Sequence, residues 1–129
     1  MKEFMLLIRN EANSKTNFPE EDHRVFLKAC EGYIEKLSRN GNMISAQPLV
    51  REGVMVSGIP TAFNEGDYTN SQEVIVGYYH ILAKDLSDAV AIAKENPEFA
   101  YTTTARVEVR PIKMKEETTA YKYPGGQQE

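Results

Sequence analysis

The sequence predicts an α+β fold in which an antiparallel sheet carries two helices on one face. Short apolar runs near the start, the middle and the end of the chain predict three strands. Two other segments repeat apolar residues at three- and four-residue steps, which predicts two helices. The order strand, helix, short hairpin, strand, helix, strand is a βαββαβ arrangement with an added hairpin, and both helices are expected on the same side of the sheet.

The first strand and the first helix follow directly from their residues. Residues 4–8 form a short, unbroken apolar run that is typical of a buried strand. Pro19 suits the first turn of a helix, and the three acids after it carry the charge that a helix N-terminus favours. Asn40-Gly41 predicts the helix end. The apolar stripe of this helix comprises Phe26, Cys30, Tyr33, Ile34 and Leu37.

Residues 43–82 are expected to hold a short hairpin, a loop and the central strand. Glu52-Gly53 suits a tight turn between short strands at 43–50 and 54–56. Residues 58–70 read as a loop with Pro60 and Gly66. The run 74–82 is the clearest strand. Strict alternation places Ile75, Tyr79 and Ile81 on one face and Val74, Val76, Tyr78, His80 and Leu82 on the other.

The end of the domain is a second helix, a last strand and a polar tail. Asp85 is expected to cap the helix, with Asp88 in a capping-box-like position and Pro97 beyond its end. Residues 106–110 alternate strictly, as a half-exposed strand does. We expect a domain over residues 1–113 and a polar C-terminal tail over 114–129. The packed side of the second helix is predicted as Leu86, Ala89, Val90 and Ala93.

The predicted face that carries His80 is too apolar to remain in water, because large exposed apolar patches are rare on monomers. The helices cover only the opposite face. A second copy of the chain is the simplest cover, so the sequence predicts a symmetric homodimer.

Composition excludes several classes of protein. Fifteen basic and nineteen acidic residues leave a net charge of −4, which argues against nucleic-acid or anionic-membrane partners. The one cysteine cannot form an intrachain disulfide, and no run of about 18 apolar residues is present. We therefore expect a cytoplasmic protein. Phosphate-loop and dinucleotide fingerprints are absent, and no ligand spacing points to a metal or other cofactor.

Titratable groups gather on and near the central strand. A histidine there suits proton transfer, because its unperturbed pKa of about 6.5 lies near working pH. A nearby carboxylate could orient the ring, and an arginine on the last strand could bind an anionic ligand. The candidate catalytic residues are His80 and Asp67, and the candidate ligand-binding residues are Tyr68, Tyr78, Glu65 and Arg110.

Each candidate also has a structural interpretation. His80 could be a hydrogen-bonded core histidine or a dimer-face residue, and Glu65 and Asp67 could be turn carboxylates facing water. Arg110 could lie on an outward edge, with Glu108 between it and Arg106. Cys30 fits a core position and His23 a surface position.

Ordered motifs over most of residues 4–112 resemble the YCII-related family, in the branch that carries an Asp-Gly-Pro-Phe motif. The matching pieces are residues 4–8, Gln47-Pro48-Leu49, Gly77-Tyr78-Tyr79, residues 85–89 and residues 107–112. The family motif corresponds here to Glu65-Gly66-Asp67-Tyr68, in which only the glycine is kept.

The resemblance implies a dimeric, ferredoxin-like α+β barrel. Some related members are associated with small-molecule enzymology, including dehydrochlorination, and a His-Asp pair is a proposed site in part of the family. Three hypotheses follow: a dimeric small-molecule-binding protein with acid–base or elimination chemistry at His80, a non-catalytic ligand-binding or regulatory module, and a structural dimer that acts through partners.

Overall fold

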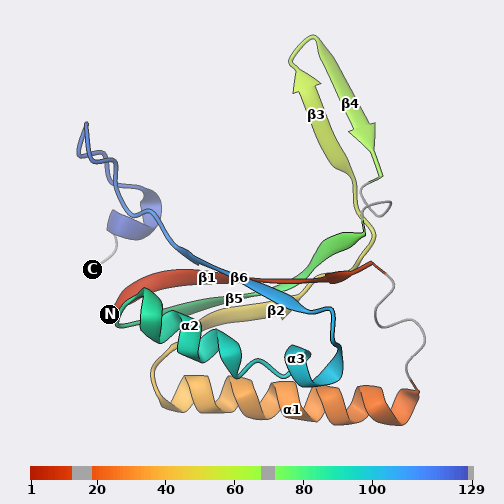
Figure 1. Cartoon of the computed structure of the whole chain (residues 1–129). Coiled ribbons are helices and arrows are strands. Elements are labelled where there is room, and N and C mark those ends of the chain that lie inside the picture. The colour runs from red at the N-terminus through yellow and green to blue at the C-terminus, as the bar shows by residue number, and fades with distance from the viewer. Residues whose placement is uncertain (13–18, 68–71, 128–129) are drawn as a thin grey trace.

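A computed structural model describes residues 1–12, 19–67 and 72–127. It contains a four-stranded antiparallel sheet in the order β2-β5-β1-β6. The helices α1, α2 and α3 lie together on one side of this sheet (Figure 1). This is the ferredoxin-like βαββαβ arrangement that the sequence predicts. The elements are β1 (Lys2–Glu11), α1 (Glu20–Arg39), β2 (Met43–Pro48), β3 (Met55–Ile59), β4 (Ala62–Gly66), β5 (Glu73–Ala83), α2 (Leu86–Lys94), α3 (Glu98–Tyr101), β6 (Arg106–Pro111) and the 3-10 turn η1 (Pro124–Gln127).

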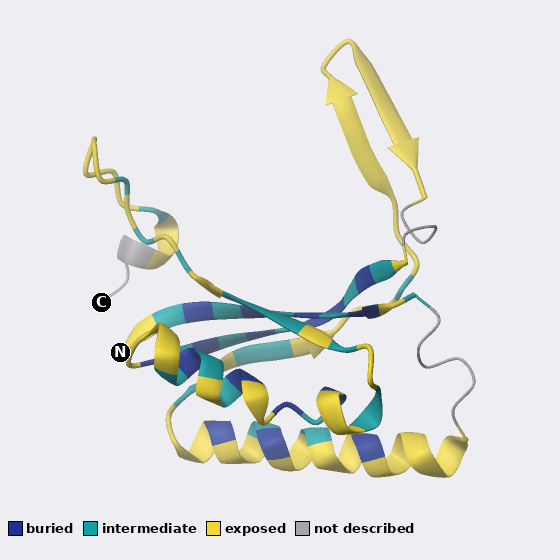
Figure 2. Cartoon of the chain, viewed as in Figure 1, coloured by how far each residue is buried: buried dark blue, intermediate teal, exposed yellow. Residues whose placement is uncertain are grey.

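The core lies between the sheet and α1 and α2 (Figure 2). Leu6 of β1 and Ile81 of β5 are fully buried at its centre. Phe26, Tyr33 and Leu37 are the buried residues of α1, so the predicted stripe is confirmed, with Cys30 and Ile34 half-buried beside it. The Tyr33 hydroxyl donates a hydrogen bond of 2.7 Å to the Ile92 carbonyl and links α1 to α2. Burial raises the pKa of the Tyr33 hydroxyl well above its usual range.

The termini of both long helices follow the predicted signals. Asn40 caps α1, and Gly41 has a φ of +75°, a conformation that glycine adopts without strain. The Asp85 carboxylate accepts a hydrogen bond of 2.8 Å from the Asp88 backbone N–H, so the predicted cap of α2 is confirmed. One prediction for α2 is wrong: Leu86 is 49% exposed, and the buried residues of α2 are Ala89 and Ala93.

The connection between β2 and β5 differs from the prediction. β3 pairs with β4, not with β2, and the two form a separate hairpin that projects from the sheet on the side away from the helices (Figure 1). The turn is therefore at Pro60-Thr61 rather than at Glu52-Gly53. Arg51 anchors the base of this hairpin, because its guanidinium donates to the carbonyl oxygens of Glu11 and Ala12 at 2.8 and 2.7 Å.

The predicted faces of β5 are also partly wrong. Ile8 pairs with Gly77 but Arg9 pairs with Ile75, so Val76 is an extra residue, a β-bulge. The bulge reverses the alternation. Val74 and Val76 therefore join Tyr79 and Ile81 against the helices, while Ile75 joins the opposite face.

Candidate functional site

The side of the four-stranded sheet that faces away from the helices is called the open face here. The alternation in β1 and β5 divides buried side chains, which point to the helices, from half-buried side chains on this other side. The β3–β4 hairpin and the C-terminal segment project at opposite ends of the sheet on the same side (Figures 1 and 2). The central open-face side chains are Met5, Leu7, Ile75, Tyr78, His80 and Leu82.

His80 forms a close pair with Glu3 on the open face. Its Nε2 lies 2.7 Å from Glu3 Oε1, and the two side chains are 25% and 26% exposed. The antiparallel register produces this contact, because Glu3 lies opposite Leu82 and Met5 lies opposite His80. Same-face neighbours diagonal across two strands are within reach of long side chains. The pair is therefore held by two rigid strands rather than by a loop.

The chemistry of the pair defines the proton positions. A carboxylate accepts hydrogen bonds and does not donate them, so Nε2 of a neutral His80 ring carries the proton toward Glu3. Nδ1 then holds the lone pair and can accept a proton from another molecule. Glu3 thus positions a histidine whose second nitrogen is the basic atom.

Two other polar side chains, Ser45 and Arg110, lie in the cross-strand row of His80. Ser45 of β2 is directly opposite His80. Arg110 of β6 is opposite Met5, the residue of β1 that is itself opposite His80. The Ser45 hydroxyl lies 3.2 Å from the Tyr78 hydroxyl, to which it donates. Tyr78 and His80 lie on the same face, as the sequence predicts.

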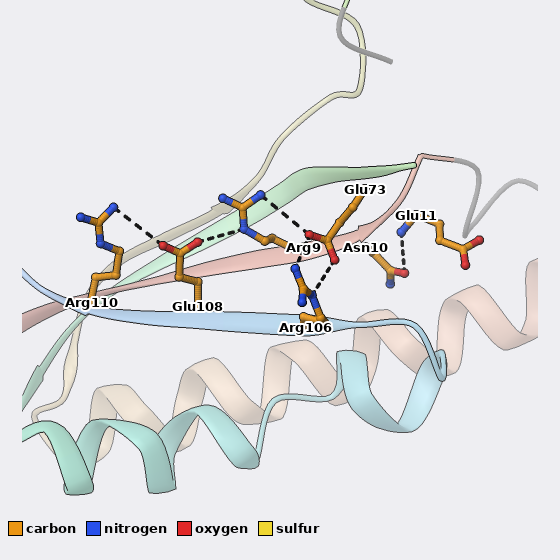
Figure 3. A network of polar contacts seen from close by, with 7 residues as sticks. All are labelled: Arg9, Asn10, Glu11, Glu73, Arg106, Glu108 and Arg110. Carbon is orange, nitrogen blue, oxygen red and sulfur yellow. Dashed lines mark hydrogen bonds and ion pairs between the residues drawn. The ribbon is translucent and has the colours of Figure 1, made fainter. Parts of the chain in front are cut away.

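A strip of ion pairs runs along the β6 side of the open face (Figure 3). Arg106 binds both carboxylate oxygens of Glu73, at 2.7 and 2.8 Å, and Arg9 donates to Glu108 at 2.9 Å. Arg110 is 67% exposed, and its guanidinium is 3.7 Å from Glu108. The strip holds three arginines and two glutamates, a net charge of +1. This side of the open face therefore favours anionic groups.

These contacts also shift the pKa values of Glu73 and Arg106. The hydrogen bonds from Arg106 hold the pKa of the Glu73 carboxyl below its usual range, and the charges of Arg106 and Arg9 act in the same direction. The same bonds raise the pKa of Arg106.

The acidic candidates on the hairpin lie apart from His80. Glu65 is exposed on β4 opposite Val56, and Asp67 directly follows β4. The hairpin joins the chain before Glu73, seven residues from His80 along β5, or roughly 23 Å at the rise of a strand. The carboxylate beside His80 is therefore Glu3 and not Asp67 or Glu65. Tyr68 lies outside the described residues.

A hollow of about 430 Å³ opens next to Glu3. It is bounded by the start of β1, by Leu82 at the end of β5 and by Ile112 and Met114 beyond β6. The hollow provides space for a small molecule within reach of one member of the His80–Glu3 pair.

Comparison with known families identifies the chain. The model of the YCII-related domain matches residues 2–113. The chain belongs to the YCII-related family. No curated protein matches this YCII-related chain.

Within residues 1–12, 19–67 and 72–127, no three His, Cys, Asp or Glu side chains gather closely enough to hold a metal ion. Over the same residues, no helix has both the length and the apolar character that crossing a membrane requires.

Sequence reasoning missed two residues of this candidate site. Glu3 is separated from His80 by 77 positions, and only the strand register brings them together. Ser45 reaches Tyr78 because β2 pairs with β5. An available signal was the charge of Glu3 at the edge of an apolar run, since a charged residue entering a strand commonly has a partner when half-buried.

Proposed function

We propose that this YCII-related domain binds a small molecule with a negatively charged group on the open face, and that His80 moves a proton to or from it. The observation that carries the proposal is the contact of 2.7 Å between His80 and Glu3 on the uncovered side of the sheet. A positioned base within hydrogen-bond reach of its orienting group is the usual arrangement for proton transfer.

Each polar group has a defined part in the proposed reaction. His80 Nδ1 removes a proton, and the resulting positive charge on the ring is stabilised by the Glu3 carboxylate. Arg110 supports the negative group of the ligand, because its guanidinium is mostly exposed and only loosely engaged with Glu108. Proton removal next to a carbonyl or a leaving group begins isomerisation and elimination, so we assign these reaction classes.

A second copy of the chain completes the proposed site. Met5, Leu7, Ile75 and Leu82 give the open face an apolar centre that the helices do not cover. Burial of this centre in a symmetric interface would remove it from water and would exclude water from the ligand. We propose a homodimer on this basis.

Exchange of protons with solvent tests the activity directly. The probes are 2-oxo acids with exchangeable C–H bonds, namely pyruvate, 2-oxobutanoate and phenylpyruvate, followed by proton NMR in D2O. We expect the chain to accelerate loss of the C–H signal of at least one probe. His80→Asn should slow that loss by ~100-fold or more, the usual contribution of a general base.

Matched variants separate chemistry from binding. His23→Asn alters the other histidine of the chain, which is exposed on α1, and should leave the rate unchanged. Arg110→Gln should raise the half-saturating probe concentration by about tenfold, as loss of one charge-assisted hydrogen bond does. Equal rates for wild type and His80→Asn would remove the proposed role of the histidine.

A further inference from the structure

A second cavity lies on the helix side of the sheet, with β5 between it and the side chain of His80. Its volume is about 400 Å³, within the range of small-molecule sites. Phe26, Ile34, Val76 and Tyr79 give it apolar walls, and Leu27, Glu31 and Glu35 of α1 stand at its exposed rim. The cavity is therefore a separate site from the open face, and it contains no histidine among the described residues.

Asn96 is a buried lining residue with an unmatched donor. The residue is 4% exposed, and its Oδ1 accepts a hydrogen bond of 2.9 Å from the Glu98 backbone N–H. That bond fixes the amide, so that Nδ2 can only donate. Among the residues that the structure describes, Nδ2 has no acceptor. A buried donor without an acceptor costs about 1–3 kcal/mol. Less than 1 Å² of Nδ2 is exposed, so a ligand acceptor that removes this cost must first displace the lining beside it.

The floor of the cavity is held rigidly. Asn10 of β1 is fully buried, and its Nδ2 donates to Glu98 Oε2 at 2.9 Å and to Thr102 Oγ1 at 2.8 Å. Its Oδ1 accepts from Thr104 Oγ1 at 2.6 Å. This network joins β1 to α3 and to the segment before β6, so Glu98 and Asn96 keep their places beside the cavity.

The charge of the lining selects among ligands. Glu31, Glu35 and Glu98 are acidic, and no lysine, arginine or histidine lines the cavity in the described parts of the chain. Burial is the main cause that raises the pKa of the Tyr79 hydroxyl, and the acidic groups Cys30 and Glu98 act in the same direction. Tyr79 therefore stays neutral. Carboxylates and phosphates would be repelled from this lining.

We infer that the cavity between α1 and the sheet binds an apolar small molecule without negative charge, which places a hydrogen-bond acceptor such as a ketone against Asn96. The site requires no second copy of the chain and none of the residues assigned to proton transfer. It would make the domain a carrier or sensor of such molecules in addition to its proposed activity.

A fluorescent naphthalene ketone, 6-propionyl-2-dimethylaminonaphthalene, is a suitable probe because it is neutral, apolar and carries one carbonyl acceptor. We expect saturable binding with blue-shifted emission. Leu27→Trp should fill the mouth of the cavity and weaken binding at least tenfold. Val25→Trp is the matched control, because Val25 is exposed on the same helix but does not line the cavity. That variant should bind the probe within twofold of wild type.

Asn96→Asp keeps the Oδ1 atom that accepts from the Glu98 backbone N–H, and it replaces the Nδ2 donor with a second carboxylate oxygen. It should weaken the ketone probe about tenfold, whereas 2-dimethylaminonaphthalene, which lacks the ketone, should change by less than twofold. Equal losses for the two probes would overturn the assignment of the acceptor to Asn96.

Cys30, the only cysteine, provides a readout that needs no variant. Saturating ketone probe should slow its reaction with N-ethylmaleimide at least fivefold. Absence of that protection while the probe is bound would overturn the location. Competition by 2-naphthoate that matches the ketone probe would overturn the charge selection.

Discussion

Glu73 is expected to make the stability of the folded chain depend on pH. Its carboxylate accepts hydrogen bonds from Nε and Nη2 of Arg106, and its pKa is lowered in the folded chain. A group with a lowered folded pKa contributes stability above its ordinary pKa and loses that contribution as pH falls through the folded value. The contribution of Glu73 is therefore complete at neutral pH and disappears in acid.

Glu73→Gln should lower the urea midpoint at pH 7, and the difference from wild type should shrink as pH falls below the ordinary pKa of a glutamate and through the lowered pKa of Glu73. Urea titrations at several pH values measure this. Glu52→Gln changes an exposed acid in the connection before β3 and serves as the control. A Glu73 effect that stays constant from pH 7 to pH 3 would contradict ionic linkage to Arg106.

Single residues also explain what could be inferred in advance at the site. His80, Tyr78 and Arg110 could be placed on strands because their neighbours alternate clearly. Glu3 could not be paired with His80, because strand register depends on contacts 77 positions apart. Gly77 was a local signal for the bulge. A Cβ there would meet the Gln47 carbonyl oxygen at 3.1 Å, and glycines within strands often mark such close approaches.

At the scale of elements, α1 and α2 were predictable because capping and apolar spacing are local properties. The β3–β4 hairpin was not, because its strands carry exposed apolar residues on both faces and Gly58 lies within β3. Val56 and Phe63 lie on one face, and Met55 and Ile59 lie on the other. Alternation of polar and apolar residues, the usual sign of a strand, is therefore lost.

A substitution at Gly58 should disturb the β3–β4 hairpin and leave the four-stranded sheet nearly unchanged. Its φ is +111°, and a Cβ would lie 2.3 Å from the Ala62 carbonyl oxygen, so Gly58→Ala must distort the β3–β4 pairing. The hairpin extends away from the core (Figure 2). We therefore expect faster amide exchange at residues 55–66 and a loss of less than about 0.5 kcal/mol in the stability of the four-stranded sheet.

Gly66→Ala is the matched control at the other end of the hairpin, where an added Cβ meets nothing within 4 Å. It should leave amide exchange in the hairpin within about twofold of wild type. A loss of more than about 2 kcal/mol in sheet stability for Gly58→Ala would mean that the hairpin and the core unfold together.

At the scale of the whole molecule, the sheet separates two chemically opposite sides. The open face carries the His80–Glu3 pair and a strip with an excess of arginine. The helix side holds an apolar cavity with acidic side chains at its rim and floor. An anionic ligand and an uncharged apolar ligand could therefore bind the same chain without competing.

The proposed homodimer yields the last prediction. Leu7 lies near the centre of the open face, half-buried in the single chain, so Leu7→Lys should leave the domain folded. In a symmetric interface each copy would bury one unpaired lysine, which costs several kcal/mol. Sedimentation equilibrium should show a wild-type dimer at micromolar concentration and a dissociation constant raised at least ~100-fold in Leu7→Lys. Val25→Lys, on the exposed side of α1, should leave the dissociation constant unchanged. A wild-type monomer at micromolar concentration would mean that the open face acts without a partner copy, and the His80–Glu3 pair would then have to bind its ligand on a solvent-exposed surface.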